Sequence, residues 1–215
     1  MISPLIKAFI FDMDGTLIHN MEYHQLAFFE FLKRHTISIT EAEYEQKNKG
    51  TITEIIPRFF GDHLSHEQIT ELGEEKETLY REMYRPHLKP IEGLIEFLEE
   101  AKNKGIRIAL ATMGDQKNVQ FTLAGLRIQH YFDAIVSGEE VKQGKPHPEV
   151  FQSAAAKLSV SPDHCLAFED SVSGITAALA ANMQVVGIAT THTPEELRAL
   201  FQLPTIIKTY TELHW

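Results

Sequence analysis

The chain has 215 residues, which suffices for one large domain or for a core domain with a small second one. Its 20 Lys and Arg residues against 30 Asp and Glu residues give a net charge of −10, which argues against a nucleic-acid partner or an anionic membrane surface. The single cysteine, Cys165, excludes an internal disulfide, and the lack of a signal peptide and of a long apolar run leads us to expect a cytoplasmic protein without membrane contact.

The N-terminal half begins with a strand and continues with helices. Residues 5–11 are apolar apart from Lys7 and predict a buried strand. Between about residues 22 and 84, apolar and aromatic residues recur at helical spacing among many Glu and Lys residues. This stretch is predicted to be all helical, and its aromatic clusters are typical of the core of a small bundle.

From residue 90 onward, predicted helices and strands alternate. The predicted helices cover residues 93–104, 117–126, 148–158, 172–181 and 194–200. The predicted strands cover residues 106–111, 132–136, 165–168, 184–188 and 205–207. This alternation favours an α/β fold, a three-layer Rossmann-like parallel sheet with helices on both faces. The expected domains are an α/β core at residues 1–18 and 88–215 and an inserted helical domain at residues 19–87.

Polar residues follow several of the predicted strands. In parallel α/β sheets, ligands bind outside the carboxyl ends of the strands, so these residues are expected to converge on one edge. They are Asp12, Asp14, Thr112, Lys145, Glu169 and Asp170. Their chemistry is coherent, because carboxylates bind a metal ion while a hydroxyl and an ammonium group bind phosphate.

The run Phe-Ile-Phe-Asp-Met-Asp-Gly-Thr-Leu at residues 9–17 is the most informative motif. Asp and Gly are also common turn residues. However, two acids this close at a strand end cost free energy unless a cation compensates. The motif therefore predicts a metal site in which Asp12 attacks an electrophile. Gly15 and Thr16 would let the loop curl so that backbone N–H groups face an oxyanion.

The other candidates each have a structural alternative. Thr112 could donate to a phosphoryl oxygen, or could simply be a β-branched strand residue. Lys145, in a loop stiffened by Pro146, could neutralise a transferring phosphoryl group or be a solvated surface lysine. Glu169 and Asp170 could bind Mg²⁺, or Asp170 or Ser171 could cap the following helix. Zinc is not expected, because no Cys or His pairs have ligand spacing.

Together these motifs resemble the haloacid dehalogenase (HAD) superfamily, and within it the β-phosphoglucomutase and sugar-phosphate phosphatase branch, over essentially the whole chain. The resemblance implies that Asp12 is the nucleophile and that Asp14 is the general acid and base. It also implies a Mg²⁺ ion held by Asp12, the backbone carbonyl of Asp14, and Asp170, with Glu169 direct or through water. Ion pumps, dehalogenases and phosphonate-cleaving relatives lack the second acid, so Asp14 disfavours those activities.

The resemblance also identifies candidate substrate contacts outside the acidic motif. After Thr112, many relatives carry small hydroxyl residues, whereas this chain has Met113, Gly114 and Asp115. Asp115 near a phosphate would be repulsive, which weakens the case for secondary phosphate contacts from this loop. Met113 and Gly114 nevertheless belong to the candidate substrate-binding set.

The helical segment resembles the cap of this family, which closes over the site, excludes water and selects the substrate. His24 lies where mutase-like relatives place a cap-hinge histidine, and the alternative is a surface histidine. Lys49 and Gly50 resemble the specificity loop of β-phosphoglucomutases. Those enzymes carry an arginine that grips a second phosphate, but here the position is Thr53. Lys76 could replace it in part, or could only solvate a helix face.

The sequence therefore favours a Mg²⁺-dependent phosphatase that hydrolyses a small phosphorylated metabolite, such as a sugar phosphate, through an aspartyl phosphate. A phosphosugar mutase of the β-phosphoglucomutase type is the first alternative. A non-catalytic module that binds a phosphorylated metabolite is the second. A small phosphorylated substrate is the expected partner, and we expect a monomer.

Overall fold

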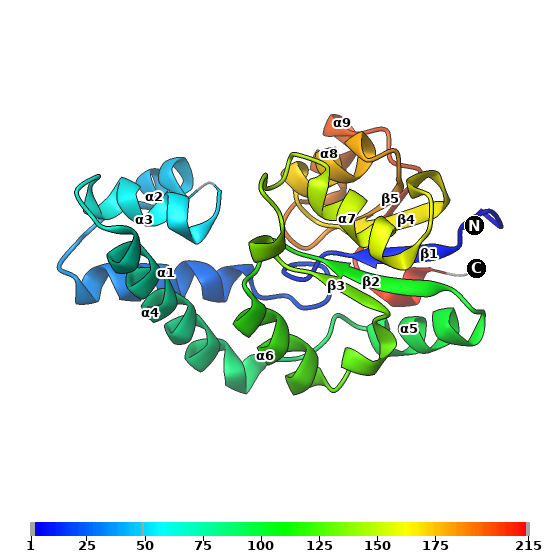
Figure 1. The fold of residues 1–215 in the computed structure, drawn as a ribbon, viewed down its shortest axis with the longest axis horizontal. Helices are drawn as coiled ribbons and strands as arrows, with labels where there is room; N and C mark the ends of the chain where they lie inside the picture. Colours follow the sequence, from blue (N-terminus) through cyan, green and yellow to red (C-terminus); the bar gives the residue numbers. More distant parts are fainter. Residues whose placement is uncertain (1–2, 49, 214–215) are drawn as a thin grey trace. The chain divides into compact units, whose positions relative to one another are not determined.

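The computed structural model describes residues 3–48 and 50–213. The chain divides into two compact units, one formed by the residues up to His19 and from Leu88 onward, the other by Asn20–His87. The ribbon of both units is drawn in Figure 1. Within the described residues, no helix combines the length and the apolar character needed to cross a membrane.

The first unit contains a parallel sheet, as predicted. Within the described residues, the strands form one sheet in the order β3-β2-β1-β4-β5-β6, and each adjacent pair is parallel. The strands are β1 (Ala8–Phe11), β2 (Arg107–Ala111), β3 (Ala134–Val136), β4 (Cys165–Glu169), β5 (Gln184–Ile188) and β6 (Thr205–Ile207). The sheet order changes direction at β1, so the carboxyl end of this central strand lies at the point where α/β folds bind ligands.

Helices cover both faces of this sheet. They are α5 (Leu94–Asn103), α6 (Gln116–Leu126), α7 (Glu149–Leu158), α8 (Val172–Ala180) and α9 (Pro194–Leu200). Short 3₁₀ turns lie in the connections, namely η2 (Gln129–Tyr131), η3 (Gly138–Glu140) and η4 (Pro162–His164), and η5 (Tyr210–Glu212) follows β6. Figure 1 shows α7 and α8 on one side of the sheet and α5 on the other.

The two faces of β1 have different partners because successive strand residues point to opposite sides. Ala8 and Ile10 belong to a core of small and aliphatic residues that includes α7 and α8. Phe9 and Phe11 form an aromatic layer on the other face, where Phe11 stacks on Phe168 with ring centroids 4.4 Å apart. All four β1 residues are buried, so β1 is anchored on both faces and fixes the start of the loop that follows it.

Four strand boundaries differ from the sequence-based expectation, and two of these are the starts of β2 and β3, at Arg107 and Ala134 rather than at residues 106 and 132. The first strand begins at Ala8 rather than at residue 5, because Leu5 is 64% exposed and a turn joins Ile6 to Ser3. The fourth strand extends through Glu169, which pairs with Gly187 of β5. Glu169 is therefore held by the sheet ladder, and Asp170 is the first residue beyond it.

The second unit is helical within its described residues. Its helices are α1 (Met21–Arg34), α2 (Glu41–Lys47), α3 (Ile52–Phe60) and α4 (His66–Tyr84), followed by the turn η1 (Arg85–His87). Capping boxes at Thr40 and Ser65 begin α2 and α4. The aromatic residues form the bundle core, as expected; the Phe28 ring lies 5.0 Å from the Phe59 ring and 5.5 Å from the Tyr44 ring.

Candidate active site

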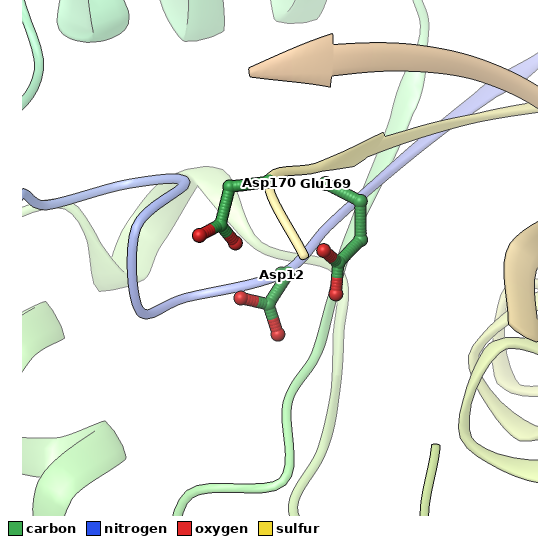
Figure 2. A group of neighbouring side chains, drawn as sticks. All are labelled: Asp12, Glu169 and Asp170. Atoms are coloured by element: carbon green, nitrogen blue, oxygen red, sulfur yellow. The ribbon is translucent and has the colours of Figure 1, made fainter. Parts of the chain in front are cut away.

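Three buried carboxylates meet at the carboxyl ends of β1 and β4. Asp12 directly follows β1, Glu169 ends β4, and Asp170 follows it. Figure 2 shows the Glu169 and Asp170 side chains reaching from the end of β4 toward Asp12. The three residues are 6%, 1% and 2% exposed, and their ligand atoms lie within 4.8 Å of one another. Sheet topology thus joins residues that are more than 150 positions apart in the chain.

Lys145 brings a positive charge to this acidic group. Its Nζ donates to Asp12 Oδ1 at 2.5 Å and to Glu169 Oε1 at 2.7 Å, and it lies 5.0 Å from the centre of the Phe151 ring. The Lys145 side chain is only 6% exposed. Burial by itself would lower the pKa of Lys145, but the Asp12 and Glu169 carboxylates outweigh burial and raise it. Lys145 is therefore a permanent cation at the candidate nucleophile.

Both carboxylate oxygens of Glu169 accept hydrogen bonds, which hold its side chain in place. Oε1 accepts from Lys145, while Oε2 accepts from the backbone N–H of Ser171 at 2.7 Å and from its hydroxyl at 3.1 Å. The first turn of α8 approaches so closely that a Cβ atom on Gly174 would lie 1.6 Å from Oε1. Glycine at 174 is thus required for Glu169 to hold Lys145 in place.

Asp170 lies against the loop that follows Asp12. Its Oδ1 accepts from the Thr16 hydroxyl at 3.4 Å, and its Oδ2 accepts from the Thr191 hydroxyl. A Cβ atom at Gly15 would lie 2.1 Å from Oδ2, and Gly15 has a φ of +77°. Both the backbone conformation and the close approach of Asp170 therefore require glycine at position 15.

The carboxylates raise one another's proton affinity. Burial, together with Glu169 and Asp14, raises the pKa of Asp12 from 3.8 to about 7 against the opposing effect of Lys145. Burial, Glu169 and Asp12 likewise raise the pKa of Asp170 well above its ordinary value. Lys145 contributes one positive charge to three buried carboxylates, so the arrangement retains excess negative charge when all are ionised.

This donor set fits a hard divalent cation. Carboxylate oxygens are the ligands that Mg²⁺ prefers, and buried carboxylates need compensation by a cation. A bound cation would also favour the ionised form of Asp12, which a nucleophile requires. Asp14, half-buried and two residues after Asp12, completes the acids of this loop.

Thr112 and the loop after it border the same site. Thr112, 1% exposed at the end of β2, accepts from the Gly114 N–H at 3.0 Å, so its hydroxyl proton remains available for a ligand oxygen. A Cβ atom at Gly114 would lie 3.3 Å from the Thr112 hydroxyl and 3.6 Å from Asp14 Oδ2. Gly114 therefore lies close to both Thr112 and Asp14, whose roles as phosphate contact and general acid and base stay predictions.

Asp115 and Met113, the unusual residues of this loop, have structural roles. The Asp115 carboxylate accepts from the Asn118 N–H at 2.6 Å and begins α6, so its charge serves as a helix cap. A Cβ atom at Gly144 would lie 3.1 Å from Met113 Cε, so Met113 packs beside the loop that carries Lys145. The expected substrate contacts from Met113 and Gly114 stay predictions.

Two candidate residues of the helical unit, His24 and Lys76, belong to one largely buried polar cluster. Lys76, 5% exposed, donates to Glu77 Oε1 at 2.8 Å and lies 3.0 Å from His24 Nδ1. The His24 ring stacks on Tyr80 with centroids 3.7 Å apart, and the Tyr80 hydroxyl accepts from Asn20 at 2.5 Å. His24 is therefore packed within the bundle, and Lys76 forms a buried ion pair.

The specificity-loop candidates lie at the start of α3. Gly50 has a φ of +102°, and the Thr53 hydroxyl lies 2.9 Å from the Thr51 hydroxyl. Lys49 falls outside the described residues.

Sequence reasoning missed several residues that hold the site. Besides Gly174, these include Thr190, whose hydroxyl donates to the Gly15 carbonyl, and Tyr210, whose hydroxyl donates to the Thr16 carbonyl at 3.0 Å. A usable signal was the Thr190-Thr191 pair, which follows the predicted strand at residues 184–188 after one intervening residue, since strand ends at this edge of a parallel sheet carry site residues.

Fold and site together define an α/β protein in which a buried lysine bonds to two of three clustered carboxylates at the carboxyl edge of a parallel sheet. The chain matches the family model of haloacid dehalogenase-like hydrolases over residues 9–188 and belongs to that family.

Three relatives illustrate the range of this similarity. The chain is 31% identical over 208 residues to the "Phosphorylated carbohydrates phosphatase" of Thermotoga maritima, covering 92% of this chain and 91% of the relative. It is 33% identical over 195 residues to the "Beta-phosphoglucomutase" of Bacillus subtilis, covering 85% of this chain and 83% of the relative. The crystal structure of a HAD hydrolase of family IA, variant 3, from Entamoeba histolytica superposes with a TM-score of 0.89 at 33% identity. The superposition covers 97% of this chain and 96% of that structure.

Proposed function

We propose that the protein is a Mg²⁺-dependent phosphatase that hydrolyses a small phosphorylated metabolite, in particular a sugar phosphate, through a phosphorylated Asp12. The observation that carries this proposal is the buried Asp12 carboxylate, held at 2.5 Å by Lys145 and grouped with Glu169 and Asp170. Relatives named as a phosphatase of phosphorylated carbohydrates and as a phosphoglucomutase support phosphoryl transfer to or from such substrates.

In the first step, an Asp12 carboxylate oxygen attacks phosphorus, and the bond between phosphorus and the leaving oxygen breaks. Asp14 donates a proton to that oxygen, so the alcohol leaves neutral. The Lys145 ammonium and the Thr112 hydroxyl offset the negative charge of the phosphoryl oxygens. The products of this step are the alcohol and a phosphorylated Asp12.

In the second step, water attacks the phosphorus of the phosphoaspartate. Asp14, now ionised, takes a proton from this water, and the bond between phosphorus and Asp12 breaks. Asp12 returns as a carboxylate, and inorganic phosphate is released. The two steps together consume one water per phosphomonoester.

The acidic group would hold the metal ion. Asp12 and Asp170 would supply carboxylate oxygens and Asp14 its backbone carbonyl, while Glu169, already bonded to Lys145 and Ser171, would contribute directly or through water. Bound there, Mg²⁺ would supply charge neutralisation between nucleophile and phosphate.

Hydrolysis is favoured over the mutase alternative by the residues of the helical unit. A phosphosugar mutase holds a second phosphate, for which a bidentate arginine is well suited. This chain has Thr53 at that position, and Lys76, the proposed substitute, is already paired with Glu77 at 2.8 Å. We therefore propose that the phosphoryl group passes to water. A buried nucleophile–lysine pair also argues against a purely binding module, which has no need of one.

The test is a panel of phosphomonoesters scored by phosphate release, with Mg²⁺ and with a chelator. We expect release from sugar phosphates that the chelator abolishes. Product analysis with glucose 1-phosphate separates the alternatives: free phosphate supports the phosphatase, and isomerised sugar phosphate with little free phosphate supports the mutase. No turnover of any ester would favour the binding module.

A further inference from the structure

The orientation of Asp170 depends on two hydroxyl groups. Asp170 is 2% exposed, yet Lys145 directs its hydrogen bonds to Asp12 and Glu169. The two Asp170 oxygens instead accept from Thr16 and Thr191. The terminal torsion of an aspartate is broad, so its intrinsic preference does not fix the carboxylate orientation and hydrogen-bond donors can set it.

The two donors are unequal. The Thr16 hydroxyl lies 3.4 Å from Oδ1, which is long for a hydrogen bond between a hydroxyl and a carboxylate. The Thr191 hydroxyl makes the closer contact, to Oδ2. Thr191 therefore has the larger part in setting the direction in which the Asp170 carboxylate faces.

Hydrogen bonds of the neighbouring residues hold Thr191 in place just after the end of β5. The preceding Ala189 N–H bonds to Ile207 O of β6 at 2.7 Å, and the Thr190 hydroxyl donates to the Gly15 carbonyl. Two residues later, the Thr193 side chain accepts from the Glu196 N–H and begins α9. Although Thr191 is exposed, the chain on either side of it is anchored, so its hydroxyl is held in place over Asp170.

We infer that Thr191 is a positioning residue, which orients the Asp170 carboxylate for the divalent cation and so sets the affinity of the site for metal. This inference rests on the proposed function, since it assigns Asp170 to the metal. Donors behind a metal ligand hold it in the geometry that the ion requires, and their loss typically weakens metal affinity about 10–100-fold.

The experiment is a calorimetric titration of the metal-free protein with Mn²⁺, which requires no substrate. For Thr191→Val we expect the dissociation constant to rise by about 10-fold or more. Thr191→Ser keeps the hydroxyl and should stay close to the wild-type value. Thr176→Val is the matched control, because the Thr176 hydroxyl bonds to a carbonyl of its own helix α8 at 2.7 Å. The Mn²⁺ affinity of this variant should equal that of the wild type.

Each outcome decides the inference. Wild-type affinity in Thr191→Val overturns it, and so does a loss in Thr191→Val that Thr191→Ser does not restore. Should Thr191→Val fail to fold, Thr191→Ala removes the same hydroxyl with a smaller side chain and is judged by the same titration. Binding of Mn²⁺ by a wild-type protein that hydrolyses no phosphoester would refute the proposed function while leaving the role of Thr191 testable by the same comparison.

Discussion

Lys145 Nζ donates to Asp12 Oδ1 at 2.5 Å, although 133 positions separate the two residues in the chain. The pair is buried, and Glu169 shares the same ammonium group at 2.7 Å. Each member of this triad is costly to bury alone, because a desolvated charge needs a partner. Asp12, Lys145 and Glu169 therefore depend on one another for stability, and under the proposed function they also do so for chemistry.

Replacing Lys145 tests this dependence. Lys145→Met leaves Asp12 and Glu169 buried without their ammonium partner, so we expect the free energy of unfolding to fall by about 3–5 kcal/mol in the metal-free protein. Phosphate release should fall about 10²–10³-fold, because a charge that stabilises the transferring phosphoryl group is lost. Urea unfolding and a phosphate assay measure the two effects.

Lys157→Met is the control for this prediction. Lys157 pairs with Glu140, but both side chains are more than 40% exposed, and such surface pairs contribute about 0–1 kcal/mol. Equal losses of activity in Lys145→Met and Lys157→Met would contradict the assigned role of Lys145.

Asp12→Asn removes the proposed nucleophile while keeping nearly the same shape. We expect phosphate release to become undetectable and the chain to remain folded, since the amide still fits between Lys145 and β1. Asp163→Asn, a change at a solvated acid of η4, should retain full activity. Circular dichroism checks the fold, and mass spectrometry of the wild type quenched during turnover checks for a phosphorylated aspartate. Substantial hydrolysis by Asp12→Asn would exclude a covalent intermediate at this residue.

Much of the core was predictable because its patterns are local and strong. The alternation of strands and helices after residue 90 predicted the parallel sheet, and the strand-end rule predicted that Asp12 and Asp170 would meet. These predictions need only the order of elements along the chain. The fold and the family are confirmed, whereas the assigned chemical roles stay predictions.

The contacts that support the site were beyond the reach of this reasoning, although the position of Thr190 and Thr191 after a predicted strand marked them as candidates. Thr191 contacts Asp170, and Tyr210 contacts the Thr16 carbonyl, through hydroxyl groups whose direction depends on the tertiary arrangement of loops. In the sequence, Gly174 likewise cannot be told from an ordinary helix residue. The structure shows that Glu169 occupies the space where a Cβ atom of residue 174 would lie. A single sequence carries no marker of such close approaches.

Stability of the metal-free protein should depend on pH in an unusual direction. The pKa of Asp12 is raised from 3.8 to about 7, so between these values the folded state binds more protons than the unfolded chain. The free energy of unfolding therefore falls as pH rises through this interval. Acids with lowered pKa values, such as Asp133 and Glu140, change the free energy of unfolding below about pH 5. The contribution of Asp12 is therefore best measured between about pH 5 and pH 7.

Mg²⁺ should counter this loss, because it favours the ionised carboxylates. At 100 times its dissociation constant a ligand adds about 2.7 kcal/mol, and we expect a larger gain at pH 7.5 than at pH 5. Urea unfolding across this range, with chelator and with Mg²⁺, measures both effects. In Asp12→Asn the pH slope with chelator should be shallower; an unchanged slope would mean that Asp12 does not titrate as described.

The close contact between α8 and Glu169 gives a final prediction. A Cβ atom at Gly174 would lie 1.6 Å from Glu169 Oε1, so Gly174→Ala must displace the carboxylate that holds Lys145. We expect a loss of about 1–3 kcal/mol in the free energy of unfolding and a fall in kcat that exceeds any rise in KM. Gly73→Ala provides the matched helical change, since its new methyl would meet the Ile52 side chain only at 3.3 Å, and it should leave kcat unchanged. Wild-type kcat in Gly174→Ala would show that Lys145 does not need Glu169 in this position.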